Sequence, residues 1–211
     1  MIAGNRLFIS LDGLDGTGKS TQCRLLSEWL RTRGYQVTQC NDPGGTAVGE
    51  VVRDLLLHRP QTLSLTCETF LFMASRAQLT AEIIRPALEA GRIVVADRHL
   101  LANVVYQGHA GGLDPNLLWE MGRLSTGGVE PNLTLVLDLS VDRARARRQR
   151  SADRLESRDA DYHEKVRAGF LAEAARHPDL IRIIDASGSI ESVHERICQE
   201  VGRVLATSSG T

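Results

Sequence analysis

Residues 13–20 form the segment of this chain whose residue types and spacing are most typical of phosphate binding. The segment reads Gly-Leu-Asp-Gly-Thr-Gly-Lys-Ser and matches G-x-x-x-x-G-K-[ST] in full. The glycines let backbone N–H groups converge on phosphate oxygens, and the N-terminus of a following helix adds a partial positive charge. Lys19 is expected to reach the β- and γ-phosphates, and the Ser20 hydroxyl to ligate Mg²⁺. The pattern therefore predicts a nucleoside triphosphate site.

The phosphate loop alone leaves the class of protein open, because kinases, ATPases and switch proteins all carry one. A switch GTPase would add Asp-x-x-Gly after a later strand and an Asn-Lys-x-Asp base reader, and neither stands where such a protein needs it. A nucleotide-binding regulatory module and a nucleic-acid-binding ATPase are the alternatives from other classes. In each case we expect nucleotide contacts along the whole loop, from Gly13, Leu14, Asp15, Gly16, Thr17, Gly18, Lys19, Ser20 and Thr21.

Asp97 and Arg98, at the end of a β-branched run, narrow these alternatives. An arginine directly after a strand-end acid offers a bidentate cation where a second phosphate would meet the γ-phosphate of the donor. The competing interpretation is a salt bridge between Arg98 and a nearby acid. Because a regulatory module has no use for such an acceptor clamp, the combination of Lys19, Asp97 and Arg98 favours a phosphotransferase.

A run of arginines between positions 143 and 158 follows the fourth predicted strand. Such charge runs are usually solvated helix faces. Phosphoryl transfer, however, benefits from a mobile flap that carries an arginine to the transferred group. We therefore predict a lid around residues 147–160. Spacing does not choose among its arginines, which include Arg147, Arg148, Arg150 and Arg154.

Apolar, β-branched runs that alternate with helical patterns indicate the fold. Predicted strands cover residues 7–11, 35–40, 93–96, 133–137 and 181–184, and predicted helices include 20–33, 47–57 and 66–90, with a frayed tail over 206–211. This alternation predicts an α/β fold, a three-layer α/β/α sandwich around a five-stranded parallel sheet, in a single domain over residues 1–211. Ligands of such sheets bind beyond the carboxyl ends of the strands. There we expect a polar rim formed by Asp12, Asp97, Asp138 and Asp185.

Composition excludes several functional classes. The chain has 211 residues, of which 42% are hydrophobic and 24% charged, and this argues against a disordered or fibrous protein. The formal net charge of −1 provides no general basic footprint for a nucleic acid, so an anionic partner must be met by a few aimed residues. No apolar run approaches the roughly 18–20 residues of a membrane span, and the first residues do not resemble a secretory signal, so a cytoplasmic location is expected.

Taken together and in order, the motifs resemble those of the thymidylate kinases (dTMP kinases), a family of P-loop nucleoside monophosphate kinases. The resemblance runs from Phe8 to Val201. It rests on the phosphate loop and on Asp42-Pro43-Gly44-Gly45-Thr46, Phe72-Met73-Ala74-Ser75-Arg76-Ala77-Gln78, Asp97-Arg98-His99, Tyr106-Gln107-Gly108, Pro131-Asn132-Leu133-Thr134 and Asp153-Arg154-Leu155-Glu156. It implies a P-loop NTPase fold, transfer of the ATP γ-phosphoryl to dTMP with Mg²⁺, and a homodimer.

The resemblance also implies roles for single residues. Phe72 is similar to the ring that stacks on thymine, and Arg76 to the residue that donates to a thymine carbonyl. Arg98 matches the clamp on the acceptor phosphate. Asp97 matches an acid linked to the magnesium shell, and Asp15 one that contacts the deoxyribose 3′-hydroxyl.

Further roles concern the sugar, the base edge and the lid. Tyr106 resembles the tyrosine that rejects a ribose 2′-hydroxyl, and Asn103 and Gln107 are placed to read the base edge or to decorate a helix surface. The absence of a basic residue within the phosphate loop resembles the bacterial type, whose catalytic arginine comes from the lid. Arg150 and Arg154 are the candidates for it.

One loop departs from the family pattern. The family usually has Arg-Glu-Pro-Gly-Gly-Thr where this chain has Asn41-Asp42-Pro43-Gly44-Gly45-Thr46. Asn41 cannot clamp a phosphate bidentately and Asp42 is one methylene shorter than glutamate, while Pro43 remains a substrate-binding candidate. The departure bears on affinity for the acceptor phosphate and leaves the transfer chemistry in place.

Overall fold

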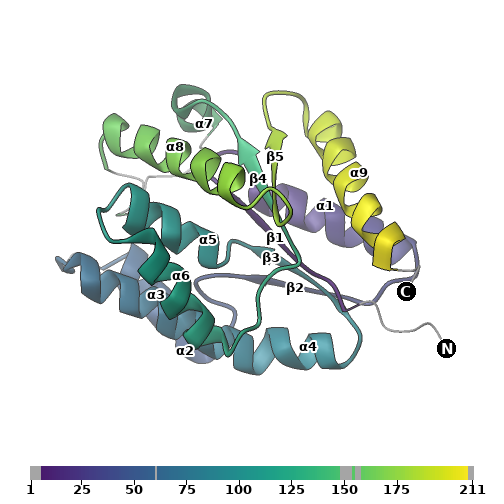
Figure 1. Ribbon diagram of the computed structural model, residues 1–211, viewed down its shortest axis with the longest axis horizontal. Coiled ribbons are helices and arrows are strands. Elements are labelled where there is room, and N and C mark those ends of the chain that lie inside the picture. The colour runs from purple at the N-terminus through teal and green to yellow at the C-terminus, as the bar shows by residue number, and fades with distance from the viewer. Residues whose placement is uncertain (1–5, 60, 148–153, 155–157, 209–211) are drawn as a thin grey trace.

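The computed structural model describes residues 6–59, 61–147, 154 and 158–208 and is built around one parallel sheet (Figure 1). Its strands are β1 (Phe8–Gly13), β2 (Val37–Asn41), β3 (Ile93–Asp97), β4 (Leu133–Asp138) and β5 (Ile181–Asp185). They lie in the order β2-β3-β1-β4-β5, and every neighbouring pair is parallel. The predicted five-stranded parallel sheet is therefore confirmed.

Helices cover both faces of the sheet, as the crossover connections between parallel strands require. The elements are α1 (Lys19–Thr32), α2 (Ala47–Leu57), α3 (Leu65–Leu79), η1 (Thr80–Ile84), α4 (Arg85–Glu89), α5 (Leu100–Asn103), η2 (Val104–His109), α6 (Pro115–Thr126), α7 (Val141–Arg147), α8 (Ala160–Arg176) and α9 (Ile190–Ser208). Helices α1 and α9 pack together on one face, whereas α4, α5 and α8 lie on the other (Figure 1).

Burial of the strands explains why they read as continuous apolar runs. All six residues of β1 are buried, and so are the first four of β3. A strand in the middle of such a sheet is covered by helices on both faces, so alternation of polar and apolar residues is lost. None of the described helices combines the length and the apolar character that crossing a membrane demands.

The predicted helix over residues 66–90 is helical throughout but changes its winding. A π-helical turn, η1, separates α3 from α4, and Arg85 N–H donates to the Thr80 carbonyl across the wider turn. Pro86 follows at once, and a proline has no N–H to offer the carbonyl one α-helical turn earlier. Widening the preceding turn accommodates the missing donor, a local feature that hydrophobic periodicity does not reveal.

The C-terminal helix extends further than the sequence predicted. α9 continues to Ser208, whereas fraying was expected over residues 206–211. Leu205 is buried at 7% exposure in the main apolar cluster, together with Val201 and Ile197, and anchors the last turns.

Gly122 on α6 allows a close approach to α5, the helix that carries Asn103. A Cβ at Gly122 would overlap the Leu100 side chain, which is itself only 1% exposed. We therefore expect Gly122→Ala to lower the free energy of unfolding by about 1–3 kcal/mol, because overpacking outweighs the helix propensity of alanine. Urea unfolding measures the change.

Gly202→Ala is the matched control, since this glycine also lies in a helix and a Cβ there would meet nothing within 4 Å. Its expected effect is a gain of about 0.5–1 kcal/mol. Equal effects of the two substitutions would contradict the packing explanation.

Candidate functional site

A cavity of about 1270 Å³ lies over the carboxyl ends of the central strands. Its walls come from the β1–α1 loop, the segment after β2, helices α2 and α3, the segment from the end of β3 into η2, and the loop that leads into α9. Segments far apart in the sequence thus meet where the parallel topology predicts a ligand. Two groups of residues line the cavity, one around the phosphate loop and one around Phe72.

The phosphate loop has the conformation its glycines permit. Gly13, Gly16 and Gly18 all have positive φ, and a Cβ at Gly13 would come within 2.6 Å of the Leu137 carbonyl oxygen. Lys19 Nζ donates to the Leu14 carbonyl at 2.8 Å, so the lysine folds back over its own loop. Burial and the nearby Arg98 charge lower the pKa of Lys19 from its ordinary value.

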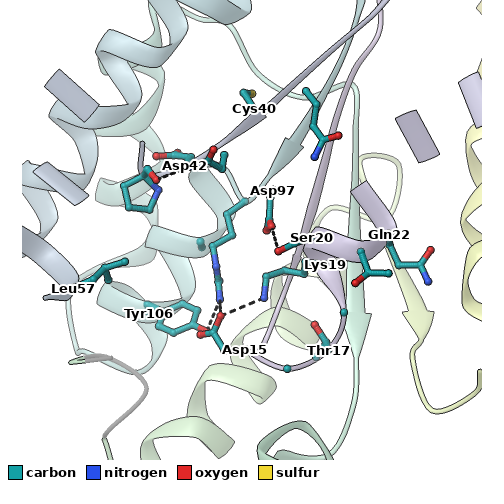
Figure 2. Close-up of a pocket in the computed structure, with 18 of the residues that line it drawn as sticks. Asp15, Thr17, Lys19, Ser20, Gln22, Cys40, Asp42, Leu57, Asp97 and Tyr106 are labelled. Carbon is teal, nitrogen blue, oxygen red and sulfur yellow. Dashed lines mark hydrogen bonds and ion pairs between the residues drawn. The ribbon is translucent and has the colours of Figure 1, made fainter. Parts of the chain in front are cut away.

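Ser20 and Asp97 meet at the mouth of the loop. Ser20 Oγ donates to Asp97 Oδ2 at 2.5 Å, as Figure 2 shows. A hydroxyl and a carboxylate side by side provide the hard oxygen donors that Mg²⁺ prefers. Among the described residues no group of three or more histidine, cysteine or acidic side chains is placed to hold a metal. Phosphate oxygens and water would therefore have to complete the coordination of a cation here.

Asp15, Arg98 and Tyr106 form a hydrogen-bonded cluster in the lining of the cavity, where Figure 2 shows Asp15 beside Tyr106. Arg98 Nη2 donates to Asp15 Oδ1 at 2.7 Å and to the Tyr106 hydroxyl at 3.2 Å. Burial alone would raise the pKa of Asp15, but the Arg98 and Lys19 charges hold it below its ordinary value. The predicted salt bridge of Arg98 to a nearby acid is thus present, and it places the guanidinium in the cavity wall.

The backbone of Arg98 explains how a strand-end residue turns into the cavity. Its φ is 71°, the left-handed region, and it alone among the described non-glycine residues has a positive φ. Such a conformation costs on the order of 1 kcal/mol for a residue with a Cβ. Its N–H still donates to the Leu11 carbonyl of β1 at 2.9 Å, so the sheet holds the strained residue in place.

Arg76 lies deeper in the wall, on α3. Its Nε donates to Asp42 Oδ2 at 2.6 Å, and the two side chains are 2% and 0% exposed. A further donor, Nη2, lies 3.4 Å from the His99 carbonyl oxygen. Asp42, in the loop that differs from the family pattern, therefore has a structural partner. This buried pair fixes the loop after β2 to α3.

Arg53 of α2 is a cavity residue that the sequence analysis missed. Its Nη1 donates to the Pro43 carbonyl at 2.6 Å, and Asn41 Nδ2 donates to the same carbonyl at 3.1 Å. Both side chains and Pro43 line the cavity. A cation is thus present beside Asn41, where the family pattern usually has an arginine in the loop itself. Only the contact between α2 and this loop reveals it, and no motif marks it.

Phe72, Asn103 and Gln107 line another part of the cavity, and together with Arg76 they are the residues predicted to meet the base. Phe72 is 9% exposed. Asn103 Nδ2 donates to Gln107 Oε1 at 2.7 Å, and Gln107 Nε2 donates to Glu68 Oε1 at 2.8 Å. The two amides are 2% and 1% exposed, so the interpretation as surface decoration is wrong.

The arginines of the predicted lid are only partly described. Arg148 and Arg150 lie outside the described residues. Arg147, at the end of α7, donates to the carbonyls of Ala186 and Gly188 and lines the cavity near the loop into α9.

Arg154 does not line the cavity and instead contacts α2 and α3. It donates to the Leu56 carbonyl and, through Nη2, to Glu68 Oε2 at 2.7 Å. Glu68 was not singled out in the sequence, because a single glutamate in a helix carries no motif.

Asp12 is not part of the polar rim, contrary to the sequence-based expectation. It lies inside β1, which continues to Gly13, and it is 0% exposed. Its Oδ1 has no hydrogen-bond partner in the part of the chain that the structure describes. The other rim residues reach their expected places, with Asp138 accepting two hydrogen bonds from Arg167 and Asp185 paired with Arg196.

Comparison with known proteins adds independent findings. Residues 11–197 match the family model described as thymidylate kinase. The chain is 43% identical over 196 residues to a thymidylate kinase of Kosmotoga olearia, with 92% of this chain and 94% of that protein covered. It is 46% identical over 189 residues to a thymidylate kinase of Rhodopirellula baltica, with 90% and 77% covered. The crystal structure of thymidylate kinase from Ehrlichia chaffeensis superposes with a TM-score of 0.76 at 30% identity, over 92% of this chain and 98% of that one.

The buried Asp12 carboxyl makes stability depend on pH. Burial raises the pKa of Asp12 to about 7, although the Arg98 and Lys19 charges act in the opposite direction. Between about pH 4 and pH 7 the folded chain therefore holds a proton that the unfolded chain has released, and this contribution to the free energy of unfolding falls as pH rises. Asp12→Asn removes this titration. We therefore expect the free energy of unfolding of the variant, relative to that of the unsubstituted chain, to be roughly 1–4 kcal/mol higher at pH 8 than at pH 4.

Urea unfolding of both proteins without nucleotide, at a series of pH values, measures this difference. A difference between the two that stays constant across the series would contradict the assignment of the titration to Asp12.

Proposed function

The chain belongs to the thymidylate kinase family, and from this premise we propose how its cavity performs the family's reaction. The protein phosphorylates dTMP to dTDP with ATP as the phosphoryl donor. The observation that carries the assignment of sites is the shared cavity: the phosphate loop and the base-facing group around Phe72 line one space, with Arg98 between them. A protein that only binds one nucleotide needs neither the second group of lining residues around Phe72 nor a cation such as Arg98 beside the phosphate loop.

ATP occupies the end of the cavity formed by the phosphate loop and the loop into α9. The loop backbone from Gly13 to Thr21 receives the phosphates at the N-terminus of α1. Arg147, Ile190 and Val193 line the same end and offer a polar edge and apolar surfaces to a purine base. This arrangement directs the γ-phosphate toward Arg98.

dTMP occupies the other end, with its phosphate beside Arg98 and its base on Phe72. Tyr106 is 5% exposed and stands against Asp15, so little space remains for a ribose 2′-hydroxyl. Arg76 donates to Asp42 through Nε, and its Nη1 and Nη2 lie 3.4 Å from Met73 Sδ and the His99 carbonyl oxygen. Each of these two nitrogens carries a second N–H, and one of them would donate to a thymine carbonyl. Asn103 presents an amide to the edge of the base.

Transfer requires an oxygen of the dTMP phosphate to attack the γ-phosphorus of ATP while the bond to the β–γ bridging oxygen breaks and ADP leaves. Two anions must approach one another, so catalysis consists mainly of alignment and charge neutralisation. Lys19 covers the donor phosphates and Arg98 bridges the acceptor and the transferred group. Release of Asp15 from Arg98 Nη2 would free that donor for phosphate and leave Asp15 for the sugar hydroxyl. A lid arginine, Arg150 or Arg154, would supply further positive charge.

Mg²⁺ fits the oxygen donors at the mouth of the phosphate loop, where Ser20 and Asp97 lie. When bound, the ion neutralises charge on the β- and γ-phosphates. Ser20 would ligate it directly, and Asp97 would hold its hydration shell at the end of β3. To ligate the ion, Ser20 would turn its hydroxyl hydrogen away from Asp97.

We also propose that two copies of the chain associate through α2, α3 and α6. These helices pack in sequence, α2 on α3 and α3 on α6. They carry exposed large apolar side chains, namely Val48, Val51, Phe70, Leu117 and Leu124. Exposed apolar side chains on helices that pack against one another support self-association. The cytoplasmic location stays a prediction.

Arg98→Ala tests the acceptor clamp. We expect turnover with ATP, Mg²⁺ and dTMP to fall by roughly 10²–10⁴-fold, because the guanidinium neutralises charge that develops during transfer. ATP binding should largely survive, since the phosphate loop is intact. ADP release measures turnover and calorimetry measures ATP affinity.

Arg24→Ala, which removes an exposed arginine of α1 paired with Glu28, is the matched control and should leave turnover unchanged. Full turnover of Arg98→Ala would remove Arg98 from the clamp role.

Leu124→Glu tests the proposed dimer, because Leu124 is 84% exposed on α6 and a charge there costs the monomer little. Light scattering should give the mass of two chains for the unsubstituted protein and of one for the variant. Leu180→Glu, at a 50% exposed leucine outside these helices, should remain a dimer. A monomeric unsubstituted protein would contradict the proposal.

A further inference from the structure

Glu68 is a buried carboxylate behind the base end of the cavity. It lies on α3, one helical turn before Phe72 and two before Arg76, and its side chain is 1% exposed. It does not itself line the cavity. Its carboxylate is surrounded by donors from Gln107, Arg154 and Arg158. Burial of a carboxylate costs free energy, and these donors offset that cost.

Two arginines form ion pairs with this carboxylate. Arg154 Nη2 lies 2.7 Å from Oε2, and Arg158 Nη2 lies 3.2 Å from the same oxygen. An ionised carboxylate only accepts hydrogen bonds, whereas a protonated carboxyl or an amide also donates. The group that faces Glu68 from η2 must therefore be a donor.

This requirement sets the orientation of two amides in turn. Gln107 has to direct its Nε2 at Glu68, which leaves its Oε1 for the neighbouring side chain. Asn103 then has to direct its Nδ2 at that oxygen. Asn103 Oδ1 remains, and it has no hydrogen-bond partner within the described part of the chain. The hydrogen bonds that run from Glu68 through Gln107 to Asn103, which we call the relay, thus end in an acceptor at a residue that lines the cavity.

We propose that Glu68 is a positioning residue that selects thymine over cytosine by fixing the polarity of the Gln107–Asn103 relay. The inference rests on the proposed function and deepens it. Thymine carries a donor at N3, which an acceptor at Asn103 satisfies. Cytosine has an acceptor at N3, so the same relay leaves two acceptors facing each other without a proton.

Glu68→Gln tests the relay, because the introduced amide nearly preserves the shape but donates as well as accepts. Gln107 and Asn103 are then free to reverse together and present Asn103 Nδ2 to the base. We expect kcat/KM for dCMP to rise while kcat/KM for dTMP falls, so that their ratio drops by about tenfold or more. A merely structural lesion would lower both values and leave the ratio unchanged.

Glu173→Gln is the matched control. Glu173 is also a buried glutamate, 0% exposed and paired with Arg176 and His109, but it lies outside the cavity lining. Its loss should alter thermal stability without changing the dTMP:dCMP ratio.

A second variant keeps the test decisive if Glu68→Gln does not fold. Gln107→Met interrupts the relay while Glu68 keeps both arginines, and it should also lower the dTMP:dCMP ratio with a gain for dCMP. An unchanged ratio in a folded variant would overturn the relay. Absence of dTMP turnover by the unsubstituted protein would instead overturn the proposed function, so the two failures are distinguishable.

Discussion

The ion pair between Arg98 and Asp15 links the phosphate loop to the end of β3, and in the proposed function the binding of both ATP and dTMP depends on it. It connects a residue at the end of β3 to one inside the phosphate loop, with 2.7 Å between Nη2 and Oδ1. The adjacency of β1 and β3 in the sheet makes this contact possible. The left-handed backbone of Arg98 then turns its side chain from the strand into the cavity, and the hydrogen bond to Leu11 keeps it there.

Charge balance around this pair prepares the cavity for phosphates. Lys19 and Arg98 are buried beside Asp15, Asp97 and Asp12, so their charges are partly compensated before a ligand arrives. In the proposed mechanism, a substrate phosphate competes with Asp15 for Arg98 and restores the same charge balance in another arrangement. The protein therefore presents cations already oriented for transfer, which reduces the reorganisation required when charge moves.

Local patterns in the sequence were sufficient for the sheet and the phosphate loop, whereas the roles of Asp15 and Tyr106 beside Arg98 came from the family resemblance. Strand-like runs and a motif with fixed spacing depend on neighbouring residues alone, and the structure confirms the sheet they predict. Three features depended on contacts between distant segments and were missed or misread. Arg53 approaches Pro43 only because α2 packs on the loop after β2. Glu68 receives its hydrogen bonds from η2 and Arg154, which are distant in the sequence. Asp12 reads as a rim residue but is enclosed because β1 extends to Gly13. The residue roles within the site stay predictions.

The most direct test of the account is ADP release by the purified protein with ATP and Mg²⁺, with dTMP, dUMP, dCMP, dGMP, UMP and thymidine offered separately. We expect strong turnover of dTMP, weaker turnover of dUMP, and none of UMP, because the role proposed for Tyr106 is to exclude a ribose 2′-hydroxyl. We also expect none with thymidine, which has no phosphate for Arg98. Preference for another acceptor would contradict the roles of Phe72, Arg76 and Tyr106. Absence of ADP release with every acceptor, while ATP still binds, would contradict the transfer reaction itself.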